Sequence, residues 1–161
     1  SESYILGLWR RAQKKIGLWM QGQLLLGLLV GVIVYLGLTI LQIEYALILA
    51  IMAAVFELIP VFGPILSAVP AILIGFSHGP TTGLLVFGFY IVMQQFENHL
   101  LYPLVVKKIV GVPSIVVILA LIIGAKLIGF LGIILAVPIS VVLIELVSDF
   151  EQRKRLTAKN V

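Results

Sequence analysis

The chain alternates long apolar stretches with short breaks of glycine, proline and charge. Residues 18–41 are almost uniformly apolar and are long enough for one full membrane crossing. Residues 81–100 form another apolar stretch, which ends in the polar run QQFENH, and we expect it to cross once. Residues 1–17 carry apolar and basic positions at helical spacing. This pattern predicts an amphipathic helix that lies at a lipid surface or leads, in solvent, into the first span.

Two further apolar stretches are each divided by a break. Residues 44–76 contain the arms 44–59 and 64–76, which as helices would be about 24 Å and about 20 Å long. Both are shorter than the roughly 30 Å hydrocarbon core of a bilayer. The intervening prolines lack an N–H donor and end the first helix. Residues 113–148 repeat this arrangement around a tip at 126–132. We therefore predict two broken-helix hairpins, each entering and leaving the membrane on one face.

The two predicted hairpins share a sequence pattern. Residues 62–70 and 130–138 align at an offset of 68 positions, where Phe, Ile, Ala, Val and Pro coincide. Chance agreement between common apolar residues is the alternative explanation. Because the crossing 81–100 separates the hairpins, the second starts from the opposite face and is inverted relative to the first. Inverted repeats with broken helices are typical of secondary transporters.

Composition places the chain in a membrane class. It is 61% hydrophobic and only 11% charged, with a mean hydropathy of +1.21, whereas a soluble domain carries about a quarter charged residues. We predict an all-α, polytopic integral membrane protein, with a transmembrane domain over 18–150 and a polar tail over 151–161. The absence of cysteine excludes disulfides and thiolate metal sites.

Charge then assigns the sides of the membrane. In this topology, the N-terminus, the 101–112 connector and the tail lie on one face, and ten of the eleven Lys and Arg residues lie there with them. An excess of cations marks the cytoplasmic face. We therefore expect both termini in the cytoplasm and the protein in a prokaryotic cytoplasmic membrane.

Three strings, taken together, resemble a known family. They are FELIPVFGP at 56–64, Gln94-Gln95-Phe96-Glu97-Asn98 before Pro103, and the Gly-x-x-Gly pattern of 129–132 that runs into Pro138. The set resembles the AI-2E family of bacterial and archaeal membrane proteins, also called autoinducer-2 exporter-like or PerM-like permeases. The chain looks like the C-terminal half of such a protein. The resemblance implies export or facilitated passage of a small solute, with autoinducer-2 as the named case, and a homo-oligomeric assembly. Some relatives are described as sodium(lithium)/proton antiporters.

Two ionisable residues stand out in the apolar arms. A carboxylate such as Glu57 is costly in a membrane segment and indicates a proton, cation or polar-substrate site. The alternative is a protonated or hydrogen-bonded structural residue. Pseudo-twofold packing of the two tips would bring Lys126 near Glu57, where the pair would gate or line a path. Alternatively, Lys126 reaches water from an exposed tip.

The densest polar cluster follows the second crossing. On a helix, Gln94, Glu97 and Asn98 share one face and are able to bind a polyhydroxylated solute or a cation. An ordinary helix end at the membrane interface is the alternative. We expect the helix breaks to be shaped by five residues, namely Pro60, Gly63, Pro64, Gly129 and Gly132.

Other functional classes lack support in the sequence. His78 and His99 do not have metal-ligand spacing, so we assign no metal site and no cofactor. No nucleophile elbow or phosphate loop is present, which argues against an enzyme. The basic pairs flank membrane segments, so nucleic acid is not needed to explain them. The leading hypothesis is a transporter, or its C-terminal half, that moves a small polar solute through a midplane site exposed alternately to each face. The alternatives are a sodium/proton-type antiporter and a non-transporting membrane scaffold.

Overall fold

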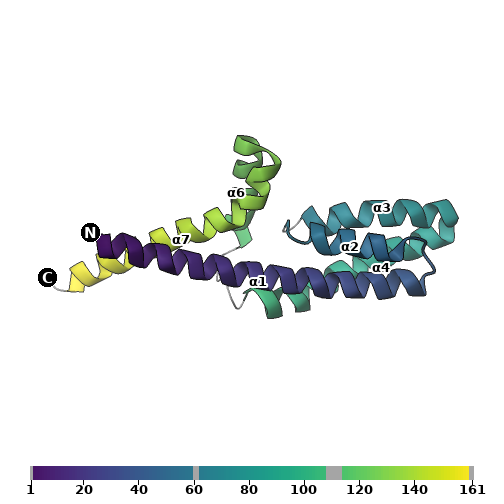
Figure 1. Cartoon of the computed structure of the whole chain (residues 1–161), viewed down its shortest axis with the longest axis horizontal. Coiled ribbons are helices and arrows are strands. Elements are labelled where there is room, and N and C mark those ends of the chain that lie inside the picture. Colours follow the sequence, from purple (N-terminus) through teal and green to yellow (C-terminus); the bar gives the residue numbers. More distant parts are fainter. Residues whose placement is uncertain (1, 60–61, 108–113, 160–161) are drawn as a thin grey trace. The chain divides into compact units, whose positions relative to one another are not determined.

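The computed structural model describes residues 2–59, 62–107 and 114–159, and all of their regular structure is helical (Figure 1). The predicted all-α class is therefore confirmed. In chain order, the elements are α1 (Glu2–Ile40), α2 (Ala46–Phe56), α3 (Phe62–His78), α4 (Pro80–Phe96), the π-helical turns η1 (Glu97–Leu101) and η2 (Pro103–Lys107), α6 (Ser114–Ile128) and α7 (Phe130–Lys159).

Two of the described helices contain a segment long and apolar enough to cross a membrane. These segments are Trp9–Ile40 in α1 and Phe130–Ser148 in α7. The helices α2 and α3 and the segment Ile115–Ile128 are also apolar, but each is shorter than 18 residues. The first segment contains the predicted crossing 18–41, whereas the second covers residues 133–148, which were predicted as a short returning arm. The predicted crossing 81–100 is not one of these segments, because α4 ends at Phe96. Re-entry of the short helices from one face of the bilayer stays a prediction.

The chain divides into two compact units. One contains residues 21–108, and the other contains residues 1–20 together with 109–161. The helix α1 contributes to both, because it is unbroken from Glu2 to Ile40. The structure therefore does not break the chain at residue 17, where the predicted interfacial helix ends. No proline interrupts this stretch, so nothing in the backbone forces a bend there.

In the 21–108 unit, α3 packs against both α2 and α4 (Figure 1). Gly79 makes the turn between α3 and α4 with φ at +141°, a backbone conformation that favours glycine. Pro80 follows in the first turn of α4, where a missing N–H costs nothing. Against α2, a Cβ on Gly27 of α1 would lie 2.7 Å from the carbonyl oxygen of Ala54. Small residues of this kind permit close helix contact in lipid.

In the other unit, α6 and α7 pack against each other. Gly129 alone separates them, with φ at +66°, so the reversal takes one residue rather than the predicted tip of 126–132. Gly124 and Gly132 then face each other so closely that a Cβ on either would overlap the other's carbonyl oxygen. The two helix backbones touch at this point.

The first pair of arms also has different bounds from those predicted. Residues 57–59 form the turn after α2, which comes before the predicted break of 60–64, and α3 already begins at Phe62. Pro64 falls in the first turn of α3, where the helix does not need its N–H. Gly63 is buried there, and its amide donates to the Ile59 carbonyl at 2.8 Å.

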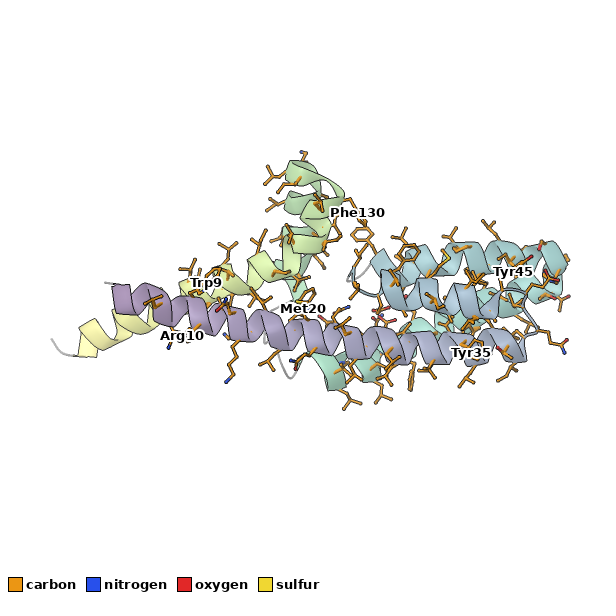
Figure 2. All side chains as sticks on the ribbon, viewed as in Figure 1. Trp9, Arg10, Met20, Tyr35, Tyr45 and Phe130 are labelled. Atoms are coloured by element: carbon orange, nitrogen blue, oxygen red, sulfur yellow. The ribbon has the colours of Figure 1, made fainter. Side chains whose placement is uncertain are left out.

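Apolar side chains cover the outside of the helices (Figure 2). The exposed residues include large side chains on α1, α2, α3 and α4, for example Leu28, Ile51, Leu73 and Val92. A soluble monomer rarely exposes apolar patches of this extent. The surface therefore suits the hydrocarbon of a bilayer.

The contact between Gly27 and Ala54 leads to a stability prediction. Gly27→Ala is expected to destabilise the 21–108 unit by roughly 1–3 kcal/mol, because the new methyl group meets a backbone carbonyl that moves only if α1 and α2 separate. Thermal unfolding in detergent, followed by circular dichroism, measures the change. The matched control is Gly88→Ala on α4, where a Cβ meets nothing within 4 Å. Equal melting temperatures for the two variants would show that the α1–α2 contact is loose.

Candidate functional site

A few polar side chains are buried inside the apolar 21–108 unit. Gln23, Glu57 and Glu97 are exposed by only 1%, 2% and 5%. Ser67 is also buried, but its hydroxyl donates to the Pro64 carbonyl within the same helix turn and needs no other partner. Burial of polar groups is costly unless they are paired. The first three residues therefore mark the place in this unit where polar chemistry is concentrated, and we call them the Gln23–Glu57–Glu97 cluster.

Glu57 and Glu97 contact each other through their carboxyl groups. Glu57 follows the last residue of α2, and Glu97 is the first residue of η1. The two side chains form a hydrogen-bonding contact, although 40 positions separate them in the sequence. The fold therefore brings two carboxyl groups together in a buried place.

Gln23 supplies the third polar group from α1. Its side-chain amide nitrogen donates to the backbone carbonyl oxygen of Glu57. That bond satisfies a carbonyl at the end of α2, where the helix itself offers no donor. The amide oxygen of Gln23 has no partner among the described residues, and neither does Oε2 of Glu57. The cluster thus holds unused hydrogen-bond acceptors.

The helix widens at the point where Glu97 enters the cluster. The α-helical pattern of α4 ends at Phe96 and continues as η1 and then η2, which begins at Pro103. Pro103 has no N–H, so it cannot continue the regular ladder of bonds. π-Helical turns are rare and occur frequently at functional sites. This turn presents Glu97 to the end of α2.

The other residues of the predicted polar face have different surroundings. Glu97 is buried, while Gln94 is half-buried and Asn98 is exposed. Their shared helical face is thus only partly enclosed. Their roles in solute binding stay predictions.

The remaining predicted residues are distributed over both units. Lys126 is exposed near the end of α6, in the unit of residues 1–20 and 109–161, and Glu57 belongs to the other unit. Their proposed pairing stays a prediction. Pro60 lies outside the described residues. Gly63, Pro64, Gly129 and Gly132 lie at or beside helix ends, as described above, and their roles as hinges stay predictions.

A second polar cluster was missed from the sequence. In the unit of residues 1–20 and 109–161, Glu145 of α7 accepts hydrogen bonds from Arg11, at 2.9 Å, and from Lys15, both on α1. The two basic side chains are about half exposed, whereas the Glu145 side chain is 11% exposed. This cluster ties α1 to α7. An isolated carboxylate within the apolar stretch 133–148 is the signal that would have found it.

An apolar groove also lies between α1 and α2. It encloses about 260 Å³ and is lined by residues that include Leu28, Gly31, Leu47 and Ala54. Its lining is almost wholly apolar, so it does not suit a polar solute. Among the described residues, no group of three or more His, Cys, Asp or Glu side chains is placed to hold a metal ion.

Comparison with known proteins gives a consistent result. A family model described as AI-2E family transporter matches residues 2–152. The chain is 40% identical over 97 residues to YueF of Bacillus subtilis (strain 168), a match that covers 60% of this chain and 26% of YueF. It is 38% identical over 101 residues to YrrI of the same strain, which covers 63% of this chain and 29% of YrrI.

A more distant relative has a name that states a substrate. The chain is 28% identical over 103 residues to the AI-2 transport protein TqsA of Escherichia coli (strain K12), covering 63% of this chain and 30% of TqsA. The matched part of the chain spans less than a third of the length of each of these three relatives.

Proposed function

The chain belongs to the AI-2E family of transporters, and from this premise we propose that it moves a small polar solute across a membrane by exposing a midplane site alternately to each face. Membership of the family confirms the resemblance drawn from the three sequence strings, and it places the chain in a multi-pass membrane family that is not enzymatic. The proposal concerns the solute, the site and the mechanism. It includes a homo-oligomeric assembly and the cytoplasmic placement of both termini.

The observation that carries the proposal is the Gln23–Glu57–Glu97 cluster. It is the set of buried side chains in the 21–108 unit that combines ionisable groups with unused acceptors. Polar groups inside a membrane domain are expensive, and they commonly mark substrate or ion pathways. The cluster also lies at two irregular points of the backbone, the end of α2 and the π-helical turn. Irregular backbone within a membrane is tolerated where protein or a wet cavity covers it.

The chemistry of the cluster favours a solute rich in hydroxyl groups. Carboxylate and amide oxygens accept hydrogen bonds, and a polyhydroxylated molecule offers several donors. The name of TqsA assigns AI-2 transport to a relative. We therefore propose an autoinducer-2-like solute for this chain, with Gln94 and Asn98 as further contacts at the edge of the cluster.

A cation is the second candidate for the transported species. Two buried carboxyl groups lie in contact, and the sequence contains no Lys or Arg between Lys15 and Lys107 to balance them. A cation would provide that balance. Exchange of sodium for protons is the activity that this observation favours.

Labelling of single cysteines tests alternating exposure. The chain contains no cysteine, so each variant carries one reactive thiol. Leu58→Cys lies at the break after α2, and Leu127→Cys lies near the end of α6; both leucines are exposed. In intact vesicles, a membrane-impermeant maleimide is expected to label each of them, and saturating solute is expected to change the labelling from the two sides in opposite directions.

The control for this experiment is Ile91→Cys, an exposed position within α4 that we place against lipid. It is expected to stay protected under all conditions. Protection of Leu58→Cys and Leu127→Cys to the same degree as Ile91→Cys would favour a scaffold whose helices only pack.

A further inference from the structure

A hydrogen-bonding contact between two carboxyl side chains needs a proton. An ionised carboxylate only accepts hydrogen bonds, whereas a protonated carboxyl group also donates one. Glu57 and Glu97 form such a contact, and they are exposed by only 2% and 5%. Two ionised carboxylates that contact each other, shielded from water, would repel each other strongly. A contact of this kind therefore fits a pair in which one carboxyl group donates its O–H and the other accepts.

Lys and Arg are absent from the described side chains of the 21–108 unit. Between Lys15 and Lys107, the sequence contains no Lys or Arg, and the side chain of Lys107 is outside those that the structure describes. The two histidines of this stretch are engaged elsewhere. His78 lies 3.9 Å from Glu44 at the far end of α2, and His99 is exposed, with Nδ1 2.9 Å from the Gln95 carbonyl oxygen.

The remaining titratable groups of the unit do not provide this charge either. Tyr90 of α4 is buried about two turns before Glu97, and its hydroxyl has no hydrogen-bond partner among the described residues. Tyr35 and Tyr45 are exposed, and Tyr102 is half-buried in the stretch between η1 and η2. A tyrosine side chain is neutral when protonated and brings no positive charge. A proton is thus the available counter-charge among the described groups that face the pair.

Gln23 provides separate evidence that the Gln23–Glu57–Glu97 cluster suits a small, positively charged species. Its side chain is 99% buried, and its amide is fixed at Glu57 because the nitrogen donates to the Glu57 backbone carbonyl. Its amide oxygen has no partner, and Oε2 of Glu57 has none either among the described residues. Unused acceptors are uncommon in a buried site. These two oxygens stay available to accept from a hydroxyl group that enters the cluster, because the shared proton is donated within the carboxyl pair.

We propose that Glu57 and Glu97 form a proton-binding site that holds one proton between them, with the amide of Gln23 fixing Glu57 in place. On release, the O–H bond of one carboxyl group breaks, and its proton passes to a water molecule or a buffer base, which leaves two carboxylates. Their repulsion then separates the end of α2 from η1. Rebinding of a proton restores the contact. The proton is thus the ligand that sets the distance between these two backbone breaks.

The role of this proton in transport rests on the function proposed above. A solute that enters the cluster with its hydroxyl groups engages the same carboxyl oxygens. Binding of the solute and binding of the proton are therefore linked, and each full transport cycle moves a proton. The existence of the site and its coupling to transport are tested separately.

Infrared spectroscopy tests the site without any need for transport. The chain, reconstituted in lipid at pH 7, is expected to show a carbonyl stretch of a protonated carboxyl group that shifts in deuterium oxide. Glu57→Gln/Glu97→Gln is expected to remove this band, and each single glutamine variant is expected to shift it, because each carboxyl group is the hydrogen-bond partner of the other. The control, Glu44→Gln, changes an exposed carboxylate and should leave the band unchanged.

Two results would overturn the site. One is the absence of the band in the unmodified chain at pH 7, and the other is a band that persists unshifted in Glu97→Gln. The positioning role of Gln23 has its own readout. Gln23→Leu is expected to shift the band, while Gln23→Glu, which keeps the shape but not the amide donor, should not restore its position.

A pH-sensitive dye trapped inside proteoliposomes tests the coupling. Addition of autoinducer-2 outside is expected to change the internal pH with the unmodified chain and with Glu44→Gln, and not with Glu57→Gln. Uptake of autoinducer-2 without any proton movement would overturn the coupling and leave the proposed function intact. Absence of uptake altogether would count against the proposed function, while the infrared result would still decide the proton site.

Discussion

Gly132→Ala is expected to destabilise the α6–α7 pair by about 3 kcal/mol, at the upper end of the range for overpacking. A methyl group at this position would overlap the carbonyl oxygen of Gly124, which belongs to the backbone of the opposing helix. A side chain is able to turn away from such an overlap, but a backbone carbonyl moves only with its helix. Because Gly129 alone connects α6 to α7, the two helices have little freedom to separate.

The matched control for this experiment is Gly17→Ala. Gly17 lies inside α1 in the same unit, and a Cβ there meets nothing within 4 Å. Both substitutions gain the same helix propensity, about 0.5–1 kcal/mol, so the difference between them isolates the overlap. Thermal unfolding in detergent gives that difference. A Gly132→Ala variant as stable as Gly17→Ala would mean that α6 and α7 do not touch at this point.

The second large effect is expected from charge reversal at Glu145. Glu145→Lys would place three cations together, because Arg11 and Lys15 of α1 both donate to this carboxylate. Hydrogen bonds to charged groups contribute roughly 1.5–3 kcal/mol when buried, and exposed pairs contribute less than about 1 kcal/mol. Since Glu145 is nearly buried and its partners are half exposed, we expect a loss of about 2 kcal/mol from the packing of α1 on α7.

Exchange of the charges distinguishes this ion pair from a general charge effect. Glu145→Lys combined with Lys15→Glu should recover most of the lost stability, because the pair is rebuilt in reverse. Glu145→Lys combined with Lys14→Glu has the same net charge but changes an exposed neighbour. It should recover little. Equal recovery in the two double variants would contradict a specific contact between Lys15 and Glu145.

The sequence contained most of the information about the helices and less about their ends. Long apolar stretches predicted the all-helical class, because a membrane chain has few other ways to satisfy its backbone. The break near Gly129 was visible as a glycine among apolar residues, but its length was not. One residue with a positive φ suffices to reverse the chain. For residues 1–17, the sequence left open an interfacial helix or a lead-in to the first span, and the unbroken α1 agrees with the second, because charged residues do not end a helix.

The candidate site was predicted in part. Glu57 was identifiable because a carboxylate in an apolar stretch is costly, and Glu97 was identifiable as a member of the polar cluster that ends the 81–100 stretch. The contact between the two carboxyl groups was not predictable from the sequence, because it depends on how the end of α2 packs against the π-helical turn. Lys126 was proposed as a partner of Glu57 because pseudo-twofold packing of the two tips would bring them together, and that pairing stays a prediction. Gln23 was overlooked among the glycines of its span, although it is more deeply buried than Glu57 or Glu97.

The central claim is that the buried Glu57 carboxyl group lies on the path of the transported solute. The most direct test is efflux of labelled autoinducer-2 from proteoliposomes that contain the unmodified chain, Glu57→Gln or Glu44→Gln, each shown to be folded by circular dichroism. We expect Glu57→Gln to reduce the rate at least about tenfold, which corresponds to about 1.4 kcal/mol, and Glu44→Gln to leave it unchanged. Equal efflux from the two folded variants would contradict the claim.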